Sequence, residues 1–519
     1  MKTGRKLGTL VALIVLSALP FVVVVVGYKQ FGLGKGVIDS LLLGEQGRNE
    51  RDDLTEEERA ELLSRLAQQS PGLWDTLPEP KVGRVLQRNI RKTFKQAEIV
   101  SNRAGMRSSR PYVPKPPDVF RIVCLGDSFV MGSAGREEDR FGDQIEAILT
   151  ESLGTVDGKT IEVYSLGVGS WSTVNAVAYL SSRLSEYKPD IVLGQMTTND
   201  LSDTMGVRGV GQLTYDFSPE HRALGSGVVS HDWPSRFQVS TGNLLNTGIG
   251  HESRARWGKA FRAWKRLEVL LEQQGATMVV GVQGWEPFAL AAAEAAEQVD
   301  LQSSLIHLDF LGERLPHDPH PNAAGHRHLA LHFLHTLATT GQLPLDSSAL
   351  PPLDKRLQPT ALGADSARLE ELQRAMVDGR LVENLDFREI PTGAVTGFLG
   401  GLHPQNLSEP LAAPPFGSPK SVFLLRRRPG STHVTVEVEV PDYPELFPFR
   451  LGMRLDGQPA AVLDLERVEE HGVHRLRGAI PPNAAQPWVV EVELRTDAYW
   501  TNIVNGTMKS YVLLSASQD

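Results

Sequence analysis

The sequence has very little cysteine, because Cys124 is the single thiol among its 519 residues. An internal disulfide is therefore excluded, and the place of Cys124 inside an apolar run indicates a small buried side chain rather than a thiol nucleophile. An excess of basic residues is also lacking, since 62 acidic residues outnumber 53 lysines and arginines and give a net charge of −9. Phosphate binding requires a basic face, so this balance argues against nucleic acid as a partner.

Charged residues are missing from one long stretch near the N-terminus. Lys2, Arg5 and Lys6 precede an uncharged run over residues 7–28. A run of about 22 residues spans roughly 33 Å as a helix, enough to cross a bilayer. Residues 1–29 are therefore predicted to form a signal-anchor transmembrane helix. A cleaved signal peptide is the alternative, but no small-x-small cleavage site follows the run.

The basic residues ahead of this run predict the orientation of the chain. They place the N-terminus in the cytoplasm and the rest of the chain outside. We therefore expect a single-pass protein of the cell inner membrane whose catalytic domain is extracytoplasmic, periplasmic or extracellular.

The chain is too long for one hydrophobic core, and its character changes along its length. Residues 30–110 are polar and helix-prone, with a capping box at Thr55 and Glu58 and a second helix expected over 85–99. A helical juxtamembrane stalk is the favoured interpretation, and a partner-binding surface is the alternative. Residues 107–117 are rich in serine and proline and are expected to link this region to the next domain.

Residues 111–345 show the alternation of strands and helices that is typical of a three-layer α/β/α domain with a parallel sheet. Strands are expected near residues 120–126, 161–167, 190–196, 277–283 and 304–309. Helices are expected near 139–151, 173–187, 254–274, 286–298 and 322–339. The long segment over 201–251 is expected either to wall a substrate groove or to be a surface loop.

The last part of the chain changes to β patterning. Residues 346–385 are expected to be a linker with a short helix, and residues 386–519 an all-β sandwich with strands near 432–440, 488–494 and 511–514. This domain resembles a jelly-roll module of the carbohydrate-binding type. Three aromatic residues are candidate sugar platforms, although aromatic residues on strands more often belong to a core. They are Trp488, Tyr499 and Trp500.

One short apolar run, residues 121–125, ends abruptly at Gly126, Asp127 and Ser128. It predicts a buried strand whose C-terminal end carries a serine, at the edge where open α/β sheets bind ligands. By itself a Gly-Asp-Ser sequence is an ordinary turn. Three further blocks follow it in order, over residues 163–172, 197–200 and 318–326.

These four blocks resemble those of the SGNH (GDSL-type) hydrolase superfamily, and the likeness to bacterial membrane-anchored members covers about residues 100–340. The resemblance implies a Ser-His-Asp mechanism in which Ser128 is the nucleophile, His320 the base and Asp318 the residue that orients the imidazole. It also implies an oxyanion hole made by the backbone N–H groups of Ser128 and Gly169 and by the side-chain amide of Asn199.

Two positions depart from the family pattern. Asp318 precedes His320 by two residues, whereas the family has three, and this places the carboxylate on the other side of an extended backbone. Either the turn at Pro319 re-aims the carboxylate or a carbonyl group orients the ring. Ser170 stands where the second block of the family has glycine, with Gly169 just before it.

The resemblance implies an esterase that needs no cofactor. The expected substrate is an acylated glycan or a small ester, with acetyl as the favoured acyl group. A metal site is not expected, because prolines interrupt the spacing of His317, His320 and His326. Two alternatives stay open: a polysaccharide O-acetyltransferase that uses the same serine, and an inactive glycan-binding or scaffolding surface protein. The sequence names no protein partner.

Overall fold

The computed structural model describes most of the chain from residue 73 onward. The described residues are 73–76, 82, 84–94, 97–112, 114–132, 135–169, 171–201, 247–308, 313–315, 320–353, 360–386, 397–403, 416–482, 486–498, 500–501, 508–509 and 511–519. Within these ranges, no helix combines the length and the apolar character needed to span a bilayer. The expected N-terminal span, the helix after Thr55 and residues 202–246 of the long segment lie outside the described residues.

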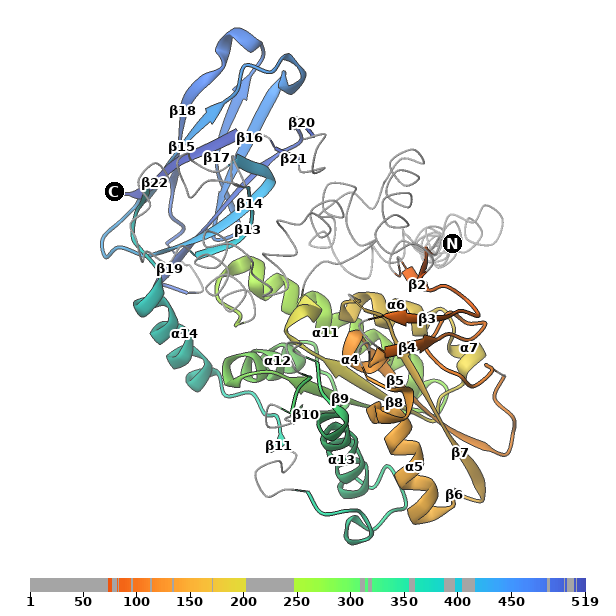
Figure 1. Cartoon of the computed structure of the whole chain (residues 1–519). Coiled ribbons are helices and arrows are strands. Elements are labelled where there is room, and N and C mark those ends of the chain that lie inside the picture. Colours follow the sequence, from red (N-terminus) through yellow and green to blue (C-terminus); the bar gives the residue numbers. More distant parts are fainter. Residues whose placement is uncertain are drawn as a thin grey trace, which may run out of the picture. The chain divides into compact units, whose positions relative to one another are not determined.

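A seven-stranded sheet forms the centre of the first domain, in the order β11-β10-β9-β8-β5-β7-β6 (Figure 1). Its five central strands are parallel to one another and match the expected strands, and its two short edge strands pair in antiparallel fashion. The central strands are β5 (Val119–Gly126), β7 (Lys159–Gly167), β8 (Ile191–Met196), β9 (Thr277–Gln283) and β10 (Ser304–Leu308), and the edges are β6 (Thr155–Val156) and β11 (Thr360–Ala361). The predicted parallel sheet is therefore confirmed.

Helices cover both faces of this sheet. One face carries α5 (Phe141–Leu153) and α13 (Ala323–Thr339), which contact each other over a shared apolar cluster. The other face carries α6 (Thr173–Ser181), α11 (Gly250–Glu272) and α12 (Glu286–Gln298), with the short α7 (Leu184–Tyr187) after α6. The five expected helices are present, except that the one predicted over 173–187 is divided into α6 and α7.

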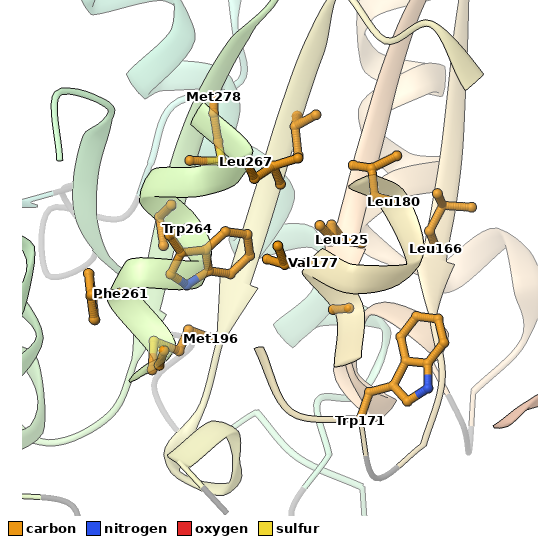
Figure 2. Close-up of a cluster of buried hydrophobic side chains, with 14 of the residues drawn as sticks. Leu125, Leu166, Trp171, Val177, Leu180, Met196, Phe261, Trp264, Leu267 and Met278 are labelled. Carbon is orange, nitrogen blue, oxygen red and sulfur yellow. The ribbon is translucent and has the colours of Figure 1, made fainter. Parts of the chain in front are cut away.

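The face under α6 and α11 is filled by tryptophan side chains and aliphatic side chains (Figure 2). Trp264 of α11 is fully buried against β8. A Cβ atom at Gly194, in the middle of β8, would lie 2.7 Å from the Trp264 ring. Glycine is therefore required in this buried strand because the indole occupies the space above the backbone.

The strand order creates a topological switch point at β5. After β5 the chain crosses to one side to form β7 and then to the other side to form β8, β9 and β10. The register places Gly126 beside Gly167 and Leu125 beside Gly194. The residues that follow these strands therefore gather at one edge of the sheet, outside the carboxyl ends of β5, β7 and β8, where open α/β sheets bind ligands.

The prediction of a helix over residues 85–99 is wrong. This segment forms β2 (Arg84–Leu86), β3 (Arg91–Phe94) and β4 (Ala97–Val100), and β1 (Trp74–Thr76) pairs with β2. Buried and more exposed side chains alternate along β4, as is typical of a strand. The sequence did not reveal this alternation, because the apolar residues of the segment also fit a helical spacing. Leu73, Leu86 and Ile99 pack against Met131 of the central domain. This part of the expected stalk therefore belongs to the core of the first domain.

The second domain is all-β, as predicted. Its strands pair in antiparallel fashion in the order β17-β16-β19-β14-β22-β15-β18, with β12 beside β22 and β13 beside β14. The two ends of this order, β17 and β18, contact each other, so the strands close around one apolar core. The bounds are β12 (Leu385–Asp386), β13 (Gly397–His403), β14 (Phe416–Arg426), β15 (His433–Val440), β16 (Phe449–Leu455), β17 (Gln458–Leu465), β18 (Gly472–Ala479), β19 (Val489–Thr496) and β22 (Tyr511–Gln518).

Between the two domains lies the helix α14 (Ser366–Arg380), which begins at an Asp365 cap. Its Arg374 guanidinium lies 4.8 Å from the ring centroid of Trp488, so that indole stacks on a neighbouring cation within the protein. This contact favours a structural role for Trp488 over a sugar platform. Tyr499 and the side chain of Trp500 lie outside the described residues.

Candidate active site

The candidate nucleophile occupies the first position of a short helix, α4 (Ser128–Met131), directly after β5. Asp127 caps this helix, because its carboxylate Oδ1 accepts a hydrogen bond of 2.9 Å from the Phe129 N–H. The helix ends at Gly132, whose φ of 63° is favourable for glycine. Ser128 is half-buried, whereas Asp127 is fully buried. The turn thus presents the hydroxyl at the edge of the sheet and keeps the carboxylate inside.

The backbone of β7 supports this turn from below. A Cβ atom at Gly167 would lie 2.4 Å from the Met131 nitrogen and 2.6 Å from the Asp127 oxygen. Real Cβ atoms do not approach backbone so closely, so only glycine fits at this end of β7. The second sequence block therefore contributes the surface on which the nucleophile turn rests.

His320 lies next to the candidate nucleophile. Its Nε2 atom is 2.7 Å from the Ser128 Oγ atom, and its ring lies against Phe129 with centroids 4.9 Å apart. When the proton of a neutral imidazole is on Nδ1, Nε2 accepts the hydrogen bond from the serine hydroxyl. This is the arrangement in which a histidine serves as general base for a serine. The predicted pair of Ser128 and His320 is therefore brought together.

The loop that carries His320 is fixed on both sides. The Leu315 N–H donates to the His320 carbonyl at 2.9 Å, and the Asn322 N–H donates to the Glu313 carbonyl at 3.0 Å. Asn322 also caps α13, because its side-chain oxygen accepts a hydrogen bond of 2.9 Å from the Gly325 N–H. His320 thus sits just ahead of a capped helix. Asp318 lies outside the described residues, and its role as the orienting carboxylate stays a prediction.

The third block follows β8 and forms the 3-10 turn η3 (Thr198–Leu201). Its Asp200 carboxyl group is buried and accepts hydrogen bonds from the Thr197 N–H at 2.6 Å and from the Thr173 hydroxyl at 3.0 Å. Burial, and then the nearby charge of Asp127, raise the pKa of Asp200 well above its ordinary value. Asp200 thus buttresses the turn. The side chain of Asn199 lies outside the described residues.

The loop of the second block follows β7 and is anchored where it leads into α6. The Trp171 N–H donates to the Val168 carbonyl at 3.0 Å, and the Trp171 side chain is fully buried. Ser172 begins α6 in a capping box, since its N–H donates to the Asn175 side chain at 2.9 Å. Gly169 lies between these anchors and Ser170 lies outside the described residues. The proposed N–H donor of Gly169 therefore stays a prediction.

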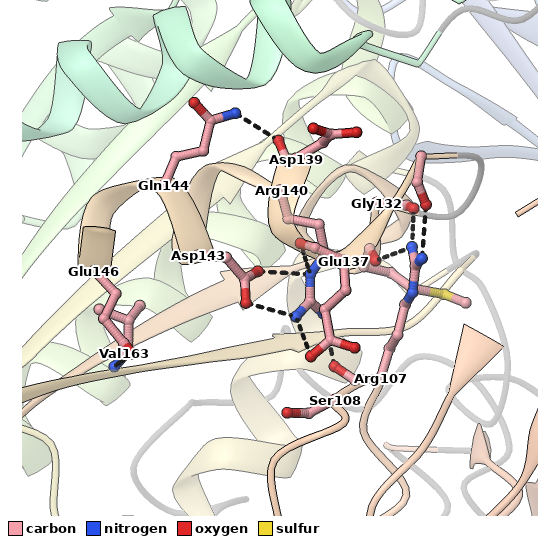
Figure 3. A network of polar contacts seen from close by, with 12 residues as sticks. Arg107, Ser108, Gly132, Glu137, Asp139, Arg140, Asp143, Gln144, Glu146 and Val163 are labelled. Carbon is pink, nitrogen blue, oxygen red and sulfur yellow. Dashed lines mark hydrogen bonds and ion pairs between the residues drawn. The ribbon is translucent and has the colours of Figure 1, made fainter. Parts of the chain in front are cut away.

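A pair of buried arginines, which the sequence interpretation did not assign to the site, fixes the chain after the nucleophile helix (Figure 3). The Arg107 guanidinium donates to the Gly132 carbonyl and, at 2.6 Å, to the Gly135 carbonyl. Arg140 donates in turn to the Arg107 carbonyl at 2.6 Å and pairs with Asp143 at 2.7 Å. Burial and the charge of Arg140 lower the pKa of Arg107 to about 10. The family likeness, which begins near residue 100, includes Arg107 but gave this residue no role.

The second histidine of the fourth block has a packing role. His326 is buried and stacks on Phe141 with centroids 6.3 Å apart. Burial lowers its pKa to about 3, and the charges of Arg140 and His320 act in the same direction. The ring is therefore neutral at ordinary pH. Across the described part of the chain, no three His, Cys, Asp or Glu side chains are grouped as metal ligands would be. His317 is outside that part.

Comparisons with known proteins give matches among solved structures alone, since no family model and no curated protein matches the sequence. A two-domain esterase active on acetylated mannans, crystallised with mannopentaose, is 12% identical over 77% of this chain and 91% of that chain, with a TM-score of 0.27. The SGNH-hydrolase family esterase AlinE4 is 13% identical over 46% and 100%, with a TM-score of 0.24. A catalytic mutant of an acetylxylan esterase from Geobacillus stearothermophilus is 15% identical over 41% and 92%, with a TM-score of 0.25.

The resemblance of the chain to a family depends on its own sequence and geometry. The four blocks occur in the family's order, and three of them follow the adjacent strands β5, β7 and β8. The fourth block supplies a histidine that contacts the serine of the first. By these features the chain resembles the SGNH (GDSL-type) hydrolase superfamily.

Proposed function

We propose that the protein is a serine esterase that hydrolyses short acyl esters, in particular O-acetyl groups on a glycan. The observation that carries this proposal is the 2.7 Å contact between His320 Nε2 and Ser128 Oγ at the switch point of the sheet. Acyl transfer needs a hydroxyl within hydrogen-bond reach of a base, and this pair meets that requirement.

The reaction proceeds in two steps on this pair. Ser128 Oγ attacks the ester carbonyl while His320 takes the hydroxyl proton, and His320 then gives that proton to the departing sugar oxygen. Water, deprotonated by His320, hydrolyses the acyl-serine and restores the free hydroxyl. In this proposal Asp318 orients the imidazole and stabilises its protonated form. The N–H groups of Ser128 and Gly169 and the amide of Asn199 hold the oxyanion.

The proposed substrate and location come from the sequence. A glycan ester is favoured by the resemblance to bacterial cell-surface members and by the resemblance of the second domain to a carbohydrate-binding module. The uncharged run over residues 7–28 supports a single-pass anchor with the catalytic domain outside the cytoplasm. No cofactor takes part in the proposed reaction.

The test uses the full-length chain purified in detergent. It should hydrolyse p-nitrophenyl acetate, release acetate from acetylated xylan or mannan, and become labelled by a fluorophosphonate. Ser128→Ala should abolish all three, whereas Ser366→Ala, at an exposed helix end, should abolish none. Acetyl transfer to an added oligosaccharide in place of hydrolysis would favour the O-acetyltransferase. A folded protein without labelling or turnover would favour the glycan-binding scaffold.

A further inference from the structure

The all-β domain shares a hydrophobic cluster with the catalytic domain at the start of α11. The cluster contains side chains from the catalytic domain, from α14 and from strands β14 and β19. Its buried members are Ile249, Met376, Val377, Leu381, Val422, Leu424 and Val489, with Trp285 and Trp488 packed against them. Burying apolar side chains from three segments in one cluster favours a fixed arrangement over a free tether.

A buried glutamine of the all-β domain caps the helix of the catalytic domain. Gln486 accepts a hydrogen bond of 2.7 Å from the Gly250 N–H, the first residue of α11. Its amide nitrogen donates to the Gly248 carbonyl at 3.2 Å and to the Gln373 side chain of α14 at 3.1 Å. Gln373 donates to the Thr247 carbonyl at 2.6 Å. These bonds tie the turn before α11 to both other segments.

A chain of charged side chains runs from the same junction to the third sequence block. Lys420 of β14 contacts Glu252 Oε2 at 2.8 Å, and the other carboxylate oxygen of Glu252 accepts a hydrogen bond of 2.8 Å from Arg256. Arg256 donates in turn to the Leu201 carbonyl at 3.3 Å. The side chains are 20%, 7% and 14% exposed for Lys420, Glu252 and Arg256. These contacts are therefore only weakly screened by solvent.

Leu201 is the last residue of η3, the turn that contains Asn199. The front of this turn is held by Asp200 through the Thr197 N–H, and Arg256 holds its end. A displaced donor loses most of its effect on an oxyanion, because stabilisation depends on a fixed geometry. The end of this turn is therefore linked to the second domain through Arg256 and Glu252.

We propose that Glu252 is a positioning residue for the esterase reaction, and that the all-β domain holds the Asn199 turn in place through Lys420, Glu252 and Arg256. The proposal rests on the proposed function. Glu252 touches no reacting atom, and it acts by directing Arg256 toward the Leu201 carbonyl. The all-β domain is accordingly an integral part of the catalytic unit.

The test measures kcat and KM of the full-length protein for p-nitrophenyl acetate. Glu252→Gln and Lys420→Met should lower kcat about tenfold to a hundredfold and change KM by less than about twofold, because a misplaced donor affects the transition state more than substrate binding. Lys420→Arg keeps a positive charge at this position and should therefore retain most of the original kcat. Arg477→Ala, which removes an exposed ion pair with Asp519 of the same domain, should leave kcat unchanged.

A double-mutant cycle separates positioning from general stability. If Glu252 acts through the Asn199 turn, Glu252→Gln should cost little further rate in an Asn199→Ala background. Additive losses, or an unchanged kcat in folded Glu252→Gln and Lys420→Met proteins, would overturn the proposal. Should Glu252→Gln fail to fold, the comparison of Lys420→Met with Lys420→Arg decides the question. Absence of Ser128-dependent turnover in the unsubstituted protein would instead refute the esterase function itself.

Discussion

The Nε2 atom of His320 lies 2.7 Å from the Oγ atom of Ser128, although the two residues are 192 positions apart in the chain. Ser128 is placed by the end of β5, and His320 by the residues just before α13. On one face of the sheet α5 and α13 pack together, and Gln144 of α5 donates to the Ala323 carbonyl at the start of α13 at 3.1 Å. The pair is therefore fixed by packing of the whole domain.

Replacing the base tests this relationship directly. His320→Ala removes the group that takes the serine proton, so we expect hydrolysis of p-nitrophenyl acetate to fall by roughly 10³- to 10⁶-fold. The ring is half-buried and the melting temperature should change little. His471→Ala, in an exposed turn of the all-β domain, is the matched control and should keep full activity. A His320→Ala protein with normal turnover would exclude this histidine as the base.

The role of Asn199 as an oxyanion donor predicts a loss in kcat. Asn199→Ala removes one donor, and such a change lowers kcat by about 10²- to 10³-fold. Asn199→Asp keeps the size of the side chain but offers only acceptor oxygens when ionised, so it should lose at least as much. Steady-state kinetics measure both effects. An Asp variant that is as active as the original protein would show that this side chain does not face the developing charge.

The close approach at Gly167 predicts a large effect of one methyl group. In Gly167→Ala the new Cβ would meet backbone atoms of Met131 and Asp127, which cannot move without displacing Ser128. We expect a loss of about 1–3 kcal/mol in the free energy of unfolding together with most of the activity. Gly363→Ala is the control, because nothing lies within 4 Å of the added atom and it should be neutral. Equal stability of the two variants would contradict the close packing of β7 against the nucleophile turn.

The features that sequence reasoning predicted are those with a local pattern. The strand before Ser128 is a β-branched run that ends at a turn, and its buried place follows from those residues alone. The strands over residues 84–100 were mistaken for a helix. Each strand is short, and the few apolar residues in this segment fit the spacing of a helix as well as that of a strand. The bond between Lys420 and Glu252 links residues 168 positions apart, and no local pattern marks either partner. Such long-range pairs come only from the folded chain.

The buried guanidinium of Arg107 predicts a structural link from the segment before β5 to the turn that carries Ser128. Arg107→Met leaves the buried carbonyl group of Gly132 and the partly buried carbonyl group of Gly135 without this donor, and a buried unsatisfied group costs about 1–3 kcal/mol. We therefore expect a loss of at least about 2 kcal/mol in unfolding free energy, and slower fluorophosphonate labelling. Arg136→Met, which breaks an exposed pair with Asp139, should cost under about 1 kcal/mol. Denaturant unfolding and labelling rates measure both.

Glu491 of β19 is a buried carboxyl group at the junction of the two domains. Its Oε2 atom accepts a hydrogen bond of 2.7 Å from the Glu252 N–H, while Oε1 has no hydrogen-bond partner among the described residues. Burial first, and then the neighbouring carboxylates, raise its pKa from 4.5 to about 8. The ionisable groups around it are Glu252 and Arg254 of α11, Lys420 of β14, Asp456 after β16, and Glu493 of β19.

The raised pKa of Glu491 predicts a fall in stability as the pH rises. Between pH 4.5 and about 8 the folded state keeps the Glu491 proton that the unfolded state has released. The free energy of unfolding therefore decreases across this window, by up to about 1.4 kcal/mol per pH unit. Glu491→Gln stays neutral and can still accept from the Glu252 N–H, so its stability relative to the original protein should rise with pH and level off above about 8. Denaturant unfolding at several pH values measures this difference. Asp464→Asn, at an exposed site on β17, is the control and should show no such trend. A pH-independent stability difference between Glu491→Gln and the original protein would mean that the Glu491 carboxyl group is already ionised in the folded state.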